Sequence, residues 1–187
     1  MLRRPILSSA ILCLFMSLPC ASQNLVPFIR LSPDEVAKAK QFAQSLKDAE
    51  ERTKKATVAW EQFHQAYQAA HPNLRSVKFT DDCRLAIAQV DAFAPGVSQT
   101  ASIELTPEER KKLESLRQEM TESEQSRKQA QNAWRDFTCQ LAANRVDTGT
   151  GYSDATLSSG KQIRIYSPWS CALTFTTDFK FAFPLGF

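Results

Sequence analysis

The chain has 187 residues and a formal net charge of +3, with 23 Lys and Arg against 20 Asp and Glu. No basic stripe alternates with aromatic residues, so nucleic acid is not expected as a partner. The chain has only five glycines, and it contains no glycine-rich phosphate loop.

Residues 1–22 have the composition of a secretory signal peptide. A basic start with Arg3 and Arg4 precedes an almost wholly apolar run, Pro5 to Leu18, and small residues follow at 20–22. The run is shorter than the about 20 residues that a membrane span needs, so we expect cleavage near Ser22 and a secreted or periplasmic protein without a transmembrane helix in the mature chain. Two alternatives stay open: acylation of Cys20, and a twin-arginine signal.

Residues 23–187 are long enough for a single domain with a core. Within them, Leu-Ser/Thr-Pro-acid-Glu followed by Trp-x-x-Phe occurs twice, at 31–63 and at 105–137, an offset of 74 residues throughout (31 to 105, 63 to 137). We interpret the repeat as an internal duplication, with one long helix in residues 31–70 and another in residues 105–144.

Each repeat opens with a helix-start signal. Ser32 and Thr106 can cap the free N–H groups, a proline follows at the first helical position, and Glu35 and Glu109 complete a capping box. A helix of roughly 38 residues would be about 57 Å long.

Larger or apolar residues recur along both repeats at alternating spacings of three and four, which predicts a coiled-coil-like seam. The series are Ala39, Phe42, Leu46, Ala49, Thr53, Ala56, Trp60, Phe63 and Tyr67, and Leu113, Leu116, Met120, Ser123, Arg127, Ala130, Trp134, Phe137 and Leu141. We expect two antiparallel helices with core anchors at Trp60, Phe63, Trp134 and Phe137, and with close approach at the small residues in the middle.

The connecting segment, residues 71–104, permits two interpretations. Thr80-Asp81-Asp82 resembles a helix cap, and the Ala-rich run up to Phe93 favours a short helix ended by Pro95-Gly96. A hairpin is the alternative, because Cys83-x-Leu85-x-Ile87 resembles the later Cys171-x-Leu173-x-Phe175.

The tail, residues 145–187, changes to turn-forming and β-branched or aromatic residues. Alternation from Leu173 to Phe183 predicts one half-buried strand, which needs partners in a small C-terminal antiparallel sheet packed on the helices. The predicted fold class is therefore α+β, mainly α.

Three cysteines remain after cleavage, in a chain that meets an oxidising environment. We prefer a disulfide between Cys83 and Cys171, each just before an apolar-alternating run, and treat Cys139 as a buried apolar residue on a helix. Connectivity does not follow from sequence, and all three pairings stay open.

Two motifs contain residue types used in catalysis or metal binding. Asp147-Thr148-Gly149 resembles the signature of aspartic proteases, in which Asp147 would match the catalytic carboxylate, but that chemistry needs two carboxylates and one copy is present. His64 and His71 are seven residues apart, about 10 Å along a helix and too far for one metal ion. No metal or cofactor is expected.

Two further resemblances concern secreted proteins. Leu31 to Glu35 and Leu105 to Glu109 are similar to the Leu-Thr-x-x-Gln motif that occurs twice in Spy-like periplasmic chaperones, with Glu in place of Gln in both copies. The alternating aromatic end of the chain, Phe179 to Phe187, is similar to the terminal strand of outer-membrane barrel proteins.

We therefore expect a secreted or periplasmic, non-enzymatic interaction or scaffold protein that acts through a helical-hairpin surface, with a protein partner or self-association. The alternatives are a peptidase or hydrolase that uses Asp147, a chaperone-like protein, and an outer-membrane-associated protein.

Overall fold

The structure is a computed structural model of the chain and describes residues 27–91, 98–145 and 151–185. Its elements in chain order are β1 (Ile29–Arg30), α1 (Pro33–Ala70), β2 (Leu74–Phe79), β3 (Leu85–Asp91), β4 (Ser98–Glu104), α2 (Pro107–Ala143), β5 (Tyr152–Thr156), β6 (Gln162–Tyr166), β7 (Leu173–Phe175) and β8 (Phe181–Pro184). The predicted α+β class, with two long helices and a C-terminal antiparallel sheet, is confirmed. In the described residues, neither helix has an apolar stretch able to cross a membrane.

Both helices begin where the capping signals predict. The Ser32 N–H donates to Glu35 Oε2 at 2.7 Å, and the Glu35 N–H donates to Ser32 Oγ at 3.3 Å. At the second helix, the same pair of bonds joins Thr106 and Glu109 at 2.9 and 3.3 Å. Each box satisfies two N–H groups that a helix start leaves without partners.

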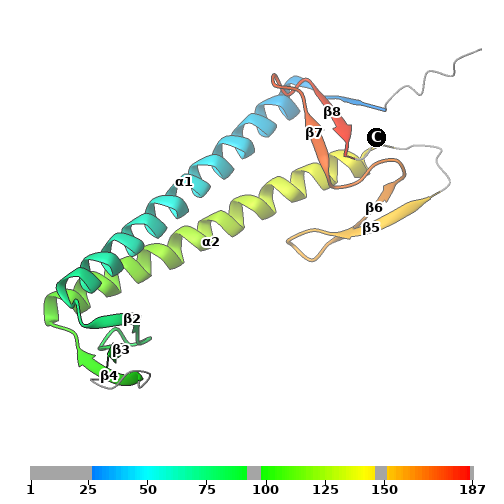
Figure 1. Cartoon of the computed structure of the whole chain (residues 1–187). Helices are drawn as coiled ribbons and strands as arrows, with labels where there is room; N and C mark the ends of the chain where they lie inside the picture. The colour runs from blue at the N-terminus through cyan, green and yellow to red at the C-terminus, as the bar shows by residue number, and fades with distance from the viewer. Residues whose placement is uncertain (1–26, 92–97, 146–150, 186–187) are drawn as a thin grey trace, which may run out of the picture.

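The helices lie side by side and run in opposite directions, which gives the molecule an elongated shape (Figure 1). Small residues occupy much of their facing surface: Ala39, Ala49, Ala56 and Ser123 are buried. In the middle, the Thr53 hydroxyl lies 3.0 Å from the Ala49 carbonyl oxygen of its own helix and 3.2 Å from the Ser123 carbonyl oxygen of the other. A side chain as short as threonine reaches the neighbouring backbone only where the two helices are close.

The larger buried side chains form two clusters, one toward each end of the hairpin. One cluster includes Tyr67, Val77 and Leu113, and joins the helices to the β2-β3-β4 sheet. The other includes Ile29, Phe137 and Ile165, and joins them to the C-terminal strands. Most apolar burial therefore lies at the two ends, and the middle of the hairpin is thin.

The connecting segment is a three-stranded antiparallel sheet in the order β2-β3-β4, so the favoured helix after Thr80 is wrong and the hairpin alternative holds. The Thr80 and Asp82 side chains do bind nearby backbone N–H groups, but they close the β2–β3 turn. The same short-range hydrogen bonds serve helix caps and turns, and pairing with β4 decided between them. Phe93, Pro95 and Gly96 lie outside the described residues.

The predicted single strand from Leu173 to Phe183 is also corrected. The chain turns back at residues 176–180, and β7 and β8 pair as a hairpin to which β1 adds, in the order β1-β8-β7. Phe179 has φ +60°, a left-handed conformation that reverses the chain and breaks the alternation. Strands β5 and β6 form a separate two-stranded sheet beside α2.

The two three-stranded sheets share one arrangement. In each, the strand before one helix pairs with the second strand of the hairpin that follows the other helix: Ile29 faces Ala182, and Ile103 faces Ala86. At the helix entries, the Leu31 N–H donates to the Lys180 carbonyl and the Leu105 N–H to the Arg84 carbonyl, both at 3.0 Å. We call positions that share a register in the two sheets equivalent positions.

Candidate functional site

The four predicted aromatic anchors lie in two separate clusters. Trp60 and Phe63 contact Phe79 of β2, with ring centroids at 6.1 and 5.5 Å. Trp134 contacts Phe137 and Phe175 of β7, at 6.1 and 5.2 Å. Phe137 is buried, and the other three are partly buried. Each Trp-x-x-Phe motif therefore packs against a sheet at its own end of the hairpin.

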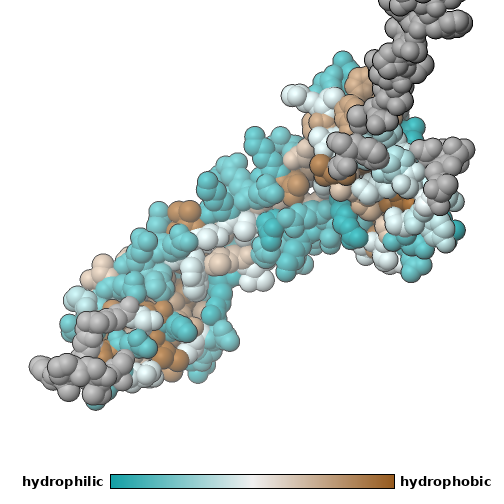
Figure 2. Space-filling model, turned by 45° about the vertical axis from the view of Figure 1, so that its right-hand side comes forward, coloured by the Kyte–Doolittle hydropathy of each residue, from teal (hydrophilic) through white to brown (hydrophobic). Residues whose placement is uncertain are grey.

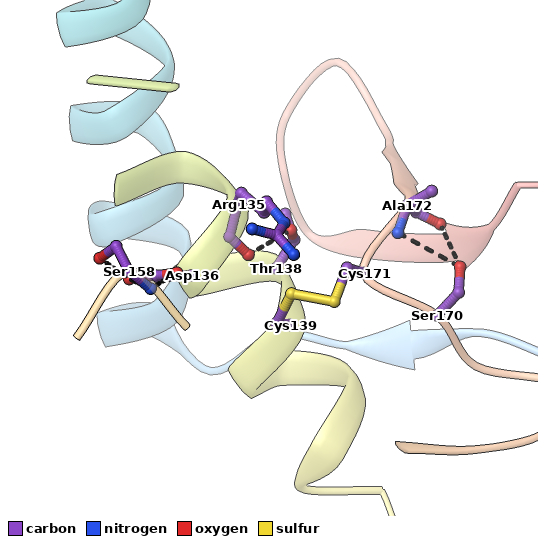
Figure 3. The surroundings of a disulfide bond; sticks show 8 residues. All are labelled: Arg135, Asp136, Thr138, Cys139, Ser158, Ser170, Cys171 and Ala172. Carbon is purple, nitrogen blue, oxygen red and sulfur yellow. Dashed lines mark hydrogen bonds between the residues drawn. A yellow bond between two sulfur atoms is a disulfide. The ribbon is translucent and has the colours of Figure 1, made fainter. Parts of the chain in front are cut away.

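The disulfide joins Cys139 of α2 to Cys171, just before β7, so the preferred Cys83–Cys171 pair is corrected (Figure 3). Cys83 is free and buried in the β2–β3 turn, in the cluster at the opposite end of the hairpin. The antiparallel arrangement separates Cys83 from the tail, whereas the end of α2 lies against it. Beside the bridge, the Ser158 N–H and hydroxyl donate to the Asp136 carboxylate.

The two histidines serve local structure. His64 Nε2 lies 2.9 Å from the Val77 carbonyl oxygen, and His71 Nδ1 lies 2.9 Å from the Tyr67 carbonyl oxygen. Over residues 27–91, 98–145 and 151–185, no group of three His, Cys, Asp or Glu side chains is arranged to hold a metal ion. Asp147 lies outside the described residues.

Four described carboxyl groups have a clearly shifted pKa, and in each the shift is downward: Glu51, Asp82, Glu124 and Asp178. The pKa of Asp178 falls to about 2, first because the Thr176 hydroxyl donates to it at 2.7 Å and then because of the Lys180 N–H. A general acid at neutral pH needs a raised pKa. These carboxylates instead stay ionised as hydrogen-bond acceptors.

Asp82 and Asp178 hold the same turn at the two ends of the molecule. In each turn, a threonine hydroxyl donates to the aspartate, the aspartate accepts an N–H two residues on, and the next N–H donates back to the threonine oxygen. The sequences are Phe-Thr-Asp-Asp-Cys-Arg-Leu at 79–85 and Phe-Thr-Thr-Asp-Phe-Lys-Phe at 175–181. The repeat of Phe-Thr-x-Asp is the signal that sequence reasoning missed.

The outer face of the β1-β8-β7 sheet carries an aromatic cluster. The ring of Phe28 lies 5.6 Å from that of Phe181 and 6.4 Å from that of Phe183. Phe28 is 57% exposed. Arg30 is directly opposite Phe181 and shares this face, because paired residues of antiparallel strands point to the same side. Figure 2 shows apolar surface at both ends of the molecule and a mainly hydrophilic surface between them.

A groove of about 750 Å³ adjoins this outer face. Its lining combines Arg30, Arg145 and Lys180 with the acid Glu35 and the apolar Leu31, Val36 and Phe181. Lys180 is paired with Asp178 at 3.1 Å, and the Glu35 carboxylate is used in the helix cap. Arg145 Nε is buried and has no hydrogen-bond partner in the described part of the chain. The groove therefore combines an apolar floor with cationic donors.

Comparisons with models of known protein families, with curated proteins and with solved structures gave no significant match.

Proposed function

We propose that this is a secreted, non-enzymatic interaction protein in which the helical hairpin is a scaffold for contacts with a protein partner. One observation carries the proposal: two helices of 38 and 37 residues place separate sheets at the two ends of the molecule, with a thin middle between them. A compact core does not need helices of about 57 Å. Helices of this length suit a protein that holds its two sheets apart and offers the surface of the helices between them for contacts.

We further infer that the helices pair through a coiled-coil seam. The burial of the side chains supports this, since none of the 18 predicted seam residues is exposed. Even Arg127 is partly buried, and its guanidinium donates hydrogen bonds of 2.8 and 2.6 Å to the Glu124 carboxylate. Between the seam residues, ion pairs such as Glu51–Lys55 at 2.9 Å lie in solvent.

We also infer that the two halves arose by duplication, and that the copied unit comprised a strand, a helix and a hairpin. The equivalent registers of the two sheets and the repeated Thr-x-Asp turn support this origin. The helices are offset by 74 residues and the turns by 96 (80 to 176). The β5–β6 hairpin is in the second half and accounts for the additional length.

The test is site-specific photo-crosslinking in cells that export the protein. Val58 is 41% exposed on α1, and a crosslinking residue at this position should capture a protein partner. A second crosslinking residue at Ile87, which is 40% exposed on β3, probes the β2-β3-β4 sheet instead of the helices. The purified protein should turn over no member of a hydrolase substrate panel. Turnover abolished by Asp147→Asn would contradict the proposal and favour the peptidase alternative.

A further inference from the structure

The two ends of the molecule share a backbone but differ in what their outer faces present. At equivalent positions, Phe28, Phe181 and Phe183 of one sheet correspond to Ser102, Leu85 and Ile87 of the other, as the register pairs show. Arg30 corresponds to Glu104, and Thr174 corresponds to Lys78. The same fold thus carries three phenylalanines, an arginine and a threonine at one end, and two aliphatic residues, a serine, an acid and a lysine at the other. The aromatic face is not required by the fold.

Aromatic side chains next to cationic ones are typical of protein surfaces that lie in a membrane interface. Phe and Leu side chains on such surfaces are buried at the boundary between the lipid headgroups and the acyl chains, and Lys and Arg are attracted to anionic lipids. Phe28 is 57% exposed, and Leu185, the last described residue, is 61% exposed at the same end. These apolar groups would lose contact with water in such an interface.

The cationic groove offers a place for a lipid phosphate. Within the described residues, Arg145 Nε is buried without a hydrogen-bond partner, and Arg30, which also lines the groove, is exposed. Glu35 and Asp178 offset part of this charge, but both are already engaged as acceptors of N–H and hydroxyl groups. The net lining is cationic, and its floor of Leu31, Val36 and Phe181 suits the first carbons of an acyl chain.

The chain order places this end of the molecule close to the predicted signal peptide. Strand β1 follows the apolar run Pro5–Leu18, with nine residues between Leu18 and Phe28. The end with the aromatic face is therefore the part of the mature chain next to the predicted signal peptide, and it would remain at the membrane in the alternative in which Cys20 is acylated.

We propose that the outer face of the β1-β8-β7 sheet docks on an anionic membrane surface, with Phe28, Phe181 and Phe183 at the boundary between headgroups and acyl chains and the adjoining groove receiving a lipid phosphate. This inference rests on the proposed function only in that it assigns one end of the scaffold to a lipid surface. Capture of a protein partner through the helices would support the proposed function whether or not this end binds lipid.

The test is co-flotation of the exported protein with vesicles that contain phosphatidylglycerol, compared with vesicles of phosphatidylcholine alone. The protein should float with the anionic vesicles and remain behind with the neutral ones. Phe28→Ser combined with Arg30→Glu, which installs the residues of the equivalent positions 102 and 104, should weaken binding about tenfold or more, because it removes an interfacial ring and reverses one charge.

The matched control is Ile87→Ser combined with Lys78→Glu, the same kinds of change on the outer face of the other sheet. It should leave vesicle binding unchanged, and thermal melts should show both double variants folded. A loss as large in the control as in the Phe28/Arg30 variant would overturn the proposal, as would equal flotation with both kinds of vesicle.

A fluorescent reporter separates insertion from simple charge attraction. Phe28→Trp should give an emission that shifts to shorter wavelength when anionic vesicles are added, because the ring leaves water. Flotation without that change would overturn the assignment of this face. If the protein floats with neither vesicle and a crosslinker at position 28 captures a protein, the face is a protein interface and the lipid proposal is wrong.

Discussion

At the residue scale, Trp60 and Trp134 pack against two different core clusters. Each is partly buried and contacts a phenylalanine of its own sheet. Trp60→Ala and Trp134→Ala should each lower the free energy of unfolding by about 2–4 kcal/mol, below the full range for buried tryptophan because both rings remain partly exposed. Chemical denaturation measures the change. The two losses should add in the double variant, because the sites lie far apart.

Val58→Ala is the control for these variants, because Val58 is exposed on the same helix as Trp60. Its effect should stay within about 0.5 kcal/mol. Losses below about 1 kcal/mol for both tryptophans would mean that the rings do not hold the sheets, and would make them candidate contacts for a partner.

Asp178 should make the stability of the folded protein sensitive to acid. Its pKa is about 2 in the folded protein, against an ordinary value of 3.8, so the folded state favours the ionised form. The stabilisation is complete above the ordinary value and is lost as pH falls through about 2. Melting temperatures measured between pH 5 and pH 2 should therefore fall less steeply in Asp178→Asn than in the unmodified protein. Equal slopes in the two proteins would contradict the assignment to Asp178.

At the element scale, the close approach of α1 and α2 depends on small side chains in the middle of the hairpin. Ala49 is 4% exposed, and the Thr53 hydroxyl reaches the Ser123 carbonyl oxygen of the other helix. Ala49→Leu should cost about 1–3 kcal/mol, because the larger side chain forces the helices apart. The neighbouring Glu50→Leu lies on the exposed side and should cost far less. Equal effects in urea denaturation would show that the helices are loosely packed there.

At the scale of the whole molecule, the disulfide fixes the tail to the end of α2. A digest of the non-reduced protein should yield the Cys139 peptide joined to the Cys171 peptide, with Cys83 as a free thiol. With a sequence separation of 32 residues, the chain-entropy model gives a stabilisation of about 3–4 kcal/mol. Cys139→Ala combined with Cys171→Ala should lose up to that amount.

Cys83 provides two checks on this assignment. It is buried, so its thiol should react with a maleimide only after unfolding. Recovery of Cys83 in the bridge would mean that the tail docks at the other end of the hairpin.

The sequence by itself determined the elements whose signals are short-range. Ser32 and Thr106, each followed by proline and by a glutamate three residues on, fixed both helix starts, because a capping box involves only neighbours in the chain. The alternating spacing of three and four indicated which side of each helix faces inward. The predicted seam, the duplication and the secretory signal remain predictions.

The tertiary structure decided the features that depend on residues far apart in the chain. Thr80-Asp81-Asp82 has the local bonds of a cap and of a turn, and only the pairing of β3 with β4 makes it a turn. Leu173 to Phe183 has the alternation of one strand, but the chain reverses at Phe179 so that β8 can pair with both β7 and β1. Cysteine pairing followed the same logic: antiparallel helices bring Cys139 to the tail and leave Cys83 at the opposite end, a distance that no local pattern encodes.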